Sequence, residues 1–151
     1  PRWVPEETVA PEGLREALGV EILYCGKTRD TLILADNAKT VRDLKPDIGA
    51  LARITDVKCA IVTAPGEDSD FVCRVFAPAF GIDEDPVTGS AHSTLIPYWA
   101  EKLGKTDLIS HQLSGRGGVL TCRDLPADGR VEMAGNAVCY LIGELQLEEE
   151  E

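Results

Sequence analysis

One apolar stretch, residues 89–103, limits the folds open to this chain more than any other feature. Its apolar residues lie on most sides of a helical wheel, which is typical of a helix buried in a protein core. They are Ala91, Leu95, Ile96, Tyr98, Trp99, Ala100 and Leu103. At about 1.5 Å per residue the helix spans about 22 Å, too short to cross a bilayer. We therefore predict a buried helix from Gly89 to Leu103, ended by Gly104.

The segment before this helix combines acidic groups with a helix start that suits an anion. Residues 81–92 read Gly-Ile-Asp-Glu-Asp-Pro-Val-Thr-Gly-Ser-Ala-His. The first N–H groups of a helix have no partner inside it, and the helix dipole adds partial positive charge there. The turn formed by Thr88, Gly89 and Ser90 is therefore a candidate for binding a carboxylate or phosphate. An ordinary capped helix after an Asp-Pro loop is equally consistent with these residues alone.

Charge and composition exclude several classes of partner. The 151-residue chain is 44% hydrophobic and 27% charged, which is ordinary for a soluble domain, and its net charge is −11. We expect no nucleic acid and no membrane as partner, because both surfaces are usually anionic. We also expect no signal peptide and no membrane-spanning run.

The cysteines and histidines indicate a reducing compartment without a metal site. Five cysteines are an odd number with no Cys-x-x-Cys pair, and most alternate with apolar neighbours as buried strand residues do. Free buried cysteines are typical of the cytoplasm, so we expect a cytoplasmic protein. His92 and His111 lack the spacing of metal ligands, so no metal is expected.

The rest of the pattern predicts short helices and many short strands. Helices are expected at 14–18, stopped by Gly19, and at 47–54. Apolar runs bounded by turn residues predict strands at 20–25, 31–35, 57–64, 71–76, 109–114, 119–123, 130–134 and 137–147. Because strands and helices do not alternate, a doubly wound sheet is disfavoured. We expect an α+β fold, with an antiparallel or mixed sheet wrapped around the 89–103 helix.

The length of the chain indicates a single domain, which we place at residues 1–147. The acidic run at residues 148–151 is interpreted as a solvated, disordered tail or a remnant of cloning.

The glycine-rich stretch at residues 115–118 has two interpretations. Its backbone could approach an anion, with Arg116 as a bidentate partner for a carboxylate. The alternative, which we favour, is a flexible hairpin turn. It is not a phosphate loop, because no Lys-Ser/Thr follows the glycines. Residues 88–92 likewise do not form the Gly-x-Ser-x-Gly motif of serine hydrolases.

Several motifs together resemble one protein family. They are Arg74-Val75-Phe76-Ala77-Pro78, Gly81-Ile82, Glu84-Asp85-Pro86-Val87-Thr88-Gly89-Ser90-Ala91, Tyr98-Trp99, Gln112, Arg116-Gly117-Gly118 and Gly135-Asn136-Ala137-Val138. On these residues the chain closely resembles the phenazine-biosynthesis PhzF-like family, from about Pro1 to Leu147. The resemblance implies a diaminopimelate-epimerase fold, in which two similar halves each wrap a sheet around a central helix. The active site lies between the halves.

The resemblance also implies an activity and a set of site residues. Characterised members are similar to cofactor-independent isomerases that move a proton on a small carboxylate substrate. Carried over to this sequence, Asp85 is implied as the catalytic acidic residue near the reacting centre. Thr88, Gly89 and Ser90 are implied as the turn that holds the substrate carboxylate, and the Ser90 hydroxyl lies in the same site.

The chain resembles only the second half of that family. The glutamate expected to shuttle the proton would lie in the first half, and Glu84 is not that residue. Lys27-Thr28 after Cys25-Gly26 also departs from the Cys-Gly-His-Ala-Thr-like helix start of the first half. We therefore expect an isomerase half-site whose partner is either the missing N-terminal half or a second copy of the chain.

Two alternatives come from other classes of function. The chain could be a non-catalytic anion-binding or interaction domain that keeps the helix end without the proton chemistry. It could also be an inactive fragment of an enzyme, which its abrupt beginning favours.

Overall fold

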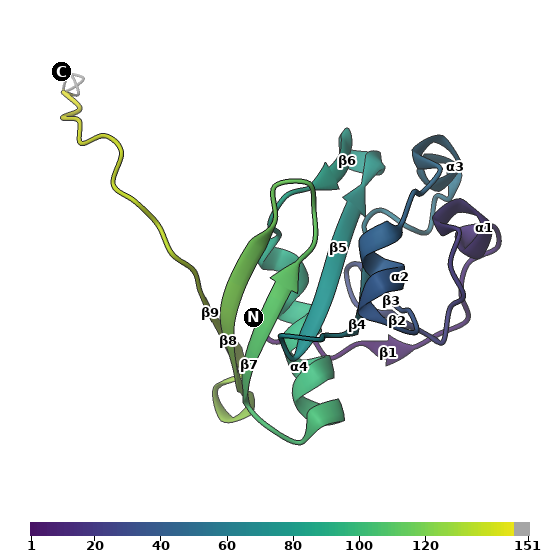
Figure 1. Cartoon of the computed structure of the whole chain (residues 1–151), viewed down its shortest axis with the longest axis horizontal. Helices are drawn as coiled ribbons and strands as arrows, with labels where there is room; N and C mark the ends of the chain where they lie inside the picture. The colour runs from purple at the N-terminus through teal and green to yellow at the C-terminus, as the bar shows by residue number, and fades with distance from the viewer. Residues whose placement is uncertain (147–151) are drawn as a thin grey trace, which may run out of the picture.

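A mixed sheet of nine strands runs through residues 1–146, the part of the chain that the computed structural model describes (Figure 1). The strand order is β1-β2-β3-β4-β5-β7-β8-β9, and β6 pairs with β5 off this path. The strands are β1 (Glu6–Glu7), β2 (Tyr24–Lys27), β3 (Thr31–Leu34), β4 (Ala60–Pro65), β5 (Phe71–Ala77), β6 (Ile82–Asp85), β7 (Asp107–Gln112), β8 (Gly118–Leu125) and β9 (Arg130–Ala134).

Two of the strand pairs are parallel and the others are antiparallel. The connection between the parallel strands β3 and β4 contains helices α2 (Ala38–Asp43) and α3 (Ile48–Arg53). The connection between β5 and β7 contains the 3-10 turn η1 (Pro78–Phe80), β6 and helix α4 (Gly89–Leu103). Parallel strands need such crossovers, because a tight turn joins only antiparallel ones. The α+β class and a mixed sheet agree with the sequence prediction.

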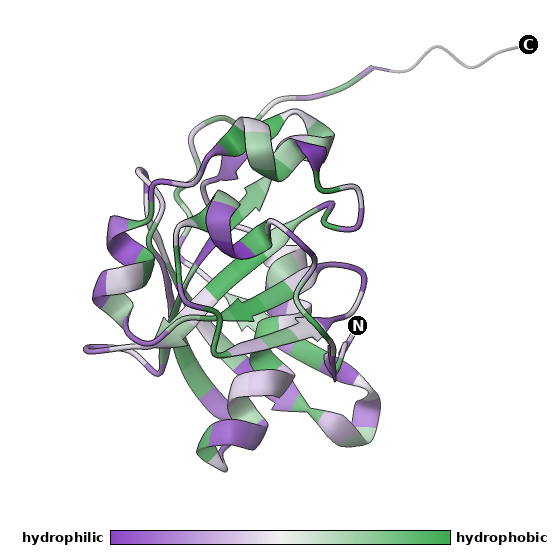
Figure 2. Cartoon of the chain, turned by 90° about the vertical axis from the view of Figure 1, so that its right-hand side faces the viewer, coloured by the Kyte–Doolittle hydropathy of each residue, from purple (hydrophilic) through white to green (hydrophobic). Residues whose placement is uncertain are grey.

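Each face of the sheet carries its own apolar core. Helix α1 (Leu14–Leu18), α2 and α3 cover one face, where they pack on side chains such as Ile33 and Val62. Helix α4 covers the other face and packs on Leu32 and Ile61. Since successive strand residues point to opposite faces, a strand covered on both sides is apolar throughout. Figure 2 shows this as green strands between the helices.

Helix α4 occupies Gly89–Leu103, the residues expected from the sequence. The backbone at Gly104 has φ 65°, a conformation that glycine adopts without strain, and it ends the helix. The Trp99 ring stacks on Phe71 with centroids 5.7 Å apart, and its Nε1 donates to Thr63 Oγ1 at 3.0 Å. These contacts bury a large aromatic side chain without leaving its polar atom unpaired.

The structure also differs from the sequence prediction. Helix α2 was not predicted, although Asn37 caps it by accepting from the Thr40 amide at 2.8 Å. The loop expected at 82–85 is strand β6, because pairing with β5 overrides the low strand propensity of its acidic residues.

Two predicted strand regions also differ. Strand β1 was not predicted, and the strand predicted at 20–25 is β2, which begins at Tyr24. The strand predicted at 137–147 is wrong over its described part, since residues 137–146 have no neighbouring strand to pair with. Residue 147 and the acidic run 148–151 lie outside the described residues.

Candidate functional site

Strand β6 places the acidic loop directly before the N-terminus of α4. Asp85, the last residue of β6, lies opposite Val75 of β5. Pro86 and Val87 then lead to Thr88, the residue that precedes the helix. The three residues between Asp85 and Gly89 therefore set the position of the carboxylate relative to the helix end.

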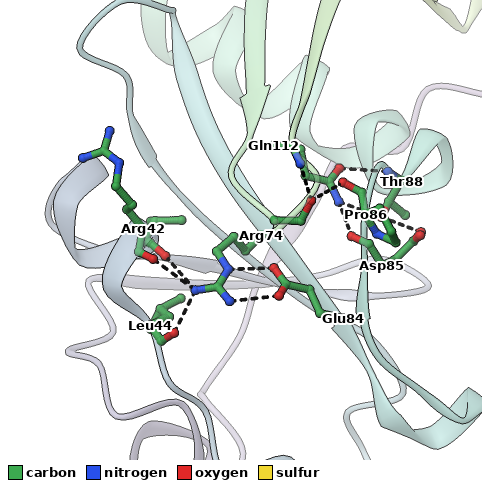
Figure 3. Close-up of polar contacts among 11 residues, drawn as sticks. Arg42, Leu44, Arg74, Glu84, Asp85, Pro86, Thr88 and Gln112 are labelled. Carbon is green, nitrogen blue, oxygen red and sulfur yellow. Dashed lines mark hydrogen bonds and ion pairs between the residues drawn. The ribbon is translucent and has the colours of Figure 1, made fainter.

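A network of side-chain hydrogen bonds holds this loop in place (Figure 3). Gln112, at the end of β7, accepts from the Thr88 amide at 2.8 Å through its Oε1. Its Nε2 donates to the Asp85 carbonyl at 2.7 Å and to Thr88 Oγ1 at 3.0 Å. The Thr88 hydroxyl in turn donates to Asp85 Oδ2 at 2.7 Å. Gln112 is almost fully buried, so its hydrogen bonds are shielded from water.

A buried histidine in the first turn of α4 holds the same loop through a hydrogen bond to its backbone. His92 contacts the Thr88 carbonyl through Nδ1 at 2.8 Å and Ser110 Oγ through Nε2 at 2.9 Å. A carbonyl can only accept, so Nδ1 carries the proton and Nε2 accepts from the Ser110 hydroxyl. Burial lowers the pKa of His92, although the hydrogen bond to Thr88 opposes the shift. His92 is therefore a neutral structural anchor near pH 7.

The first residues of α4 face solvent. Gly89 and Ser90 are both exposed, and their backbone amides donate to no group within residues 1–146. The Thr88 side chain does not cap the helix, because its hydroxyl is directed to Asp85. These two amides are free donors at the positive end of the helix dipole.

A groove of about 620 Å³ opens beside this helix end. It is lined by Val87, Gly89, residues 116–120 and residues 133–136. Arg116 is exposed on the turn between β7 and β8 and contributes a positive charge to the groove. Gly89 and Arg116 therefore line one groove, although they lie 27 positions apart in the sequence.

The turn that carries Arg116 joins the antiparallel strands β7 and β8, so it is the hairpin turn that the sequence analysis favoured. It is also hydrogen-bonded to the loop before α4. Ser114 Oγ donates to the Pro86 carbonyl at 2.7 Å and accepts from the Gly117 amide at 3.0 Å. A Cβ atom on Gly118 would lie 2.5 Å from Val87 Cγ2, so only glycine allows this close approach.

Glu84, the neighbour of Asp85, is bound to an arginine. Arg74 donates to both carboxylate oxygens of Glu84, through Nε at 2.7 Å and through Nη2 at 2.9 Å (Figure 3). Its Nη1 donates to the Leu44 carbonyl at 2.8 Å and lies within 3.4 Å of two further carbonyls at the end of α2. The ion pair therefore fastens β6 to the end of α2. Asp83 and Asp85 form no ion pair with the described residues, and of these two only Asp85 is held by the Thr88 hydroxyl.

Four of the five cysteines are buried thiols. Burial raises the pKa of Cys59 and of Cys122 to about 12, so both stay protonated at neutral pH. The described residues contain no group of three or more histidine, cysteine, aspartate or glutamate side chains placed to hold a metal ion. Among the helices of the described chain, none combines the length and the apolar character that a bilayer crossing requires.

Comparison with known proteins identifies the family. The family model for phenazine biosynthesis-like proteins, PhzC-PhzF, matches residues 7–143. The chain belongs to this family. An uncharacterized isomerase of Pseudomonas aeruginosa is 47% identical over 150 residues, covering 97% of this chain and 56% of that protein. A human phenazine biosynthesis-like domain-containing protein is 37% identical and covers 92% of this chain and 52% of its own length.

Solved structures of the family agree with the fold. A crystal structure of a phenazine biosynthesis PhzC/PhzF protein from Clostridium difficile matches with a TM-score of 0.86 and 37% identity. The match covers 97% of this chain and 56% of that one. The chain thus spans about half the length of the relatives that it matches.

The structure assigns contacts that sequence reasoning did not. Gln112 was recognised only as part of the family pattern, and its hydrogen bonds to the loop were not predicted. His92 was considered only as a metal ligand, and Ser110 was not considered. Gln112 and Ser110 are far from Thr88 in the sequence and reach this region only through the fold, whereas His92 lies on the buried side of α4. No local sequence pattern therefore marks these three residues. Ser110 and Gln112 alternate with Leu108 on the buried face of β7, and polar residues at such positions were the one available signal.

Proposed function

We propose that this chain forms one half of the active site of a cofactor-independent isomerase that transfers a proton on a small carboxylate-bearing molecule. The observation that carries the proposal is the Asp85 carboxylate, held by the Thr88 hydroxyl beside the free amides that begin α4. The relatives named as uncharacterized isomerases support the same reaction class.

In this proposal the helix end binds the substrate carboxylate. The amides of Gly89 and Ser90 donate to it, and the Ser90 hydroxyl is available for a further contact. Arg116, which lines the same groove as Gly89, adds attraction for an anion. The Thr88 amide already donates to Gln112, so Thr88 contributes by orienting Asp85 and not by binding the substrate itself.

Asp85 is the proposed catalytic residue. Its Oδ2 accepts from Thr88, while its Oδ1 accepts no hydrogen bond from the described residues. A carboxylate fixed in this way can take a proton from substrate carbon or assist its return. Moving a proton across a substrate needs a second group on the other side. Because Glu84 is bound to Arg74, we place that group on a partner.

The partner in this proposal is the first half of a diaminopimelate-epimerase-like fold or a second copy of this chain. The domain proposed here comprises residues 1–147, with a sheet wrapped around α4. The coverage of about half of each relative fits one of two similar halves. The protonated, buried cysteines fit a cytoplasmic protein.

A second candidate function is anion binding without catalysis. The groove with Gly89 and Arg116 favours it, because this part of the site needs no second proton-transfer group. The two functions differ in one measurable property, which is proton exchange between substrate and solvent.

The test is solvent-deuterium incorporation into a panel of small carboxylic acids by an assembly that contains this chain. We expect Asp85→Asn to lower the exchange rate by about 10²–10⁴-fold, because general acid–base catalysis contributes that much. Asp83→Asn, an exposed neighbour on the same strand, is the matched control and should leave the rate unchanged. Ser90→Ala should weaken carboxylate binding by only about 0.5–1.5 kcal/mol, since the amides remain. Equal exchange rates in Asp85→Asn and the unmodified chain would contradict the catalytic role of Asp85 and favour anion binding without catalysis.

A further inference from the structure

One buried amide side chain, that of Gln112, makes three hydrogen bonds to the loop before α4 (Figure 3). The residue is 1% exposed and lies at the end of β7, which pairs with β5 as β6 does. Its Oε1 accepts from the Thr88 amide, and its Nε2 donates to the Asp85 carbonyl and to Thr88 Oγ1. Both donors of the amide are therefore used, and each partner belongs to the loop.

These partners fix the orientation of the Gln112 amide. With the amide turned over, its NH2 group would meet the Thr88 N–H, which is a donor. Its oxygen would meet the Asp85 carbonyl, which is an acceptor. Neither contact would be a hydrogen bond. Gln112 is thus the donor in its contact with the Thr88 hydroxyl.

This donation sets the direction of the Thr88 hydroxyl. The hydroxyl oxygen accepts from Nε2 of Gln112, and the group has a single hydrogen of its own. That hydrogen is directed to Asp85 Oδ2, which lies 2.7 Å from Oγ1. Thr88 is 8% exposed, so little water competes for either bond. Gln112 therefore acts on the Asp85 carboxylate through one intermediate hydroxyl.

Gln112 also holds the main chain of the same aspartate, since its Nε2 lies 2.7 Å from the Asp85 carbonyl oxygen. The register of β6 against β5 shifts between Val75 and Ala77, so the strand pair alone places Asp85 less firmly than a regular ladder would. One side chain thus restrains Asp85 at its backbone directly and at its carboxylate through Thr88.

A purely structural role would require only part of this arrangement. The buried Thr88 amide needs an acceptor, which Oε1 of Gln112 supplies. A carboxylate of the same shape at position 112 would supply one as well. The Nε2 donors are what such a carboxylate would lack, and they are directed to Asp85 and to the hydroxyl that contacts it. The donors and the acceptor of Gln112 can therefore be tested separately.

We propose that Gln112 is a positioning residue for proton transfer at Asp85, whose carboxylate it orients through the Thr88 hydroxyl. Gln112 itself does not touch the substrate. When its donors are removed, the Thr88 hydrogen can turn to the new acceptor, and Asp85 Oδ2 then loses its partner. The carboxylate is free to occupy other rotamers in that state. This inference rests on the proposed function, although it can fail while that function stands.

The deuterium-exchange assay of the assembly tests this role when kcat and KM are measured separately. Gln112→Glu keeps the acceptor and removes both donors, whereas Thr88→Val removes the hydroxyl at nearly constant shape. Each should lower kcat by about 10–100-fold and change KM less than about twofold, because the carboxylate is misplaced while the helix amides remain. Thr88→Ser, which keeps the hydroxyl, should stay within about threefold of the unmodified kcat. Thr121→Val, at an exposed threonine of β8, is the matched control and should leave both constants unchanged.

The Asp85→Asn background distinguishes positioning from a general loss of structure. A residue that acts only through Asp85 should change kcat there by less than about twofold, whereas a structural defect should lower it in both backgrounds. The inference is overturned by losses that persist in this background, by a change in KM alone, or by unchanged constants in Gln112→Glu and Thr88→Val. These three results leave the proposed function standing. Full activity of Asp85→Asn itself would overturn the proposed function and this inference with it.

Hydrogen exchange of side-chain amides gives a measurement that needs neither a substrate nor a variant. Gln112 and Gln146 are the two glutamines of the chain, and Gln146 is exposed. In NMR spectra the NH2 hydrogens of Gln112 should exchange with solvent at least about 100-fold more slowly than those of Gln146, because both take part in buried hydrogen bonds. Equal exchange rates of the two side chains would show that the Gln112 donors are not held by the loop and would overturn the proposal.

Discussion

Thr88 shows how a single residue sets the geometry of this loop. Its amide donates to Gln112, its hydroxyl accepts from Gln112 and donates to Asp85, and its carbonyl accepts from His92. All polar groups of Thr88 are therefore used within the protein, and the residue is buried. Its effect is to hold one carboxylate oxygen of Asp85 at a fixed place beside the helix start.

The buried His92 predicts a specific pH dependence of stability. Burial lowers its pKa below the ordinary value of 6.5, so the folded protein binds fewer protons than the unfolded chain. The stabilisation is complete above that value and is lost as the pH falls below it. We expect the free energy of unfolding, measured in urea, to fall more steeply between pH 7 and 5.5 in the unmodified protein than in His92→Gln. Equal slopes in the unmodified protein and in His92→Gln would contradict the assignment.

Strand β6 is an element held by its neighbours and not by its own sequence. It pairs with β5 through an irregular register, and the Arg74–Glu84 ion pair ties it to the end of α2. Both side chains of this pair are mostly buried. Arg42, within α2, instead forms an exposed and longer ion pair with Glu67, at 3.7 Å. The position of Asp85 thus depends on a contact between segments 30 or more residues apart.

Replacing Arg74 tests that dependence. Arg74→Met should lower the free energy of unfolding by about 3 kcal/mol, because it leaves a buried carboxylate and three carbonyl groups without their donor. Arg42→Met, at the exposed pair, should change it by less than about 0.5 kcal/mol. Chemical denaturation measures both. A similar small loss in the two variants would mean that β6 is held by its strand pairing alone.

Helix α4 provides a second prediction at the level of elements. Leu95 is fully buried on its sheet-facing side, so Leu95→Ala should cost about 2–5 kcal/mol of stability. Leu103→Ala, in the same helix but 43% exposed, should cost less than about 1 kcal/mol. Thermal and urea unfolding compare the two, and a loss below about 0.5 kcal/mol for Leu95→Ala would show that the helix is peripheral.

On the scale of the whole molecule, the domain consists of two apolar cores on one sheet, followed by residues 137–146, the terminal segment, which belong to neither core. The cores involve strands and all four α-helices of the described chain, whereas residues 137–146 are exposed throughout. The stability of the domain is therefore expected to depend on the two cores and not on residues 137–146.

Shortening the chain tests this expectation. Removing every residue after Asn136 should leave the free energy of unfolding of the domain unchanged within about 0.5 kcal/mol, since no core contact is lost. The shortened protein should also show less concentration-dependent association in sedimentation, because its largest exposed apolar run is gone. A clear loss of stability would show that the terminal segment packs on its own domain.

Local patterns in the sequence determined the parts of this protein that depend on near neighbours. The apolar residues of 89–103 and the glycine at 104 specify a buried helix, and the continuous motif around Asp85 identifies the family. Strand β9 was also predicted with the observed bounds. In these cases residues within a few positions of one another carry the whole signal.

Only the tertiary structure decided the rest. Strand β6 consists of residues with poor strand propensity and exists because β5 pairs with it. Gln112 and Ser110 reach the loop from strand β7, and Arg116 meets Gly89 across a groove. The terminal segment has the pattern of a strand, yet no strand forms where no neighbour supplies hydrogen bonds. Sheet pairing and site assembly join residues far apart in the chain, so their energies appear only when the fold brings those residues together.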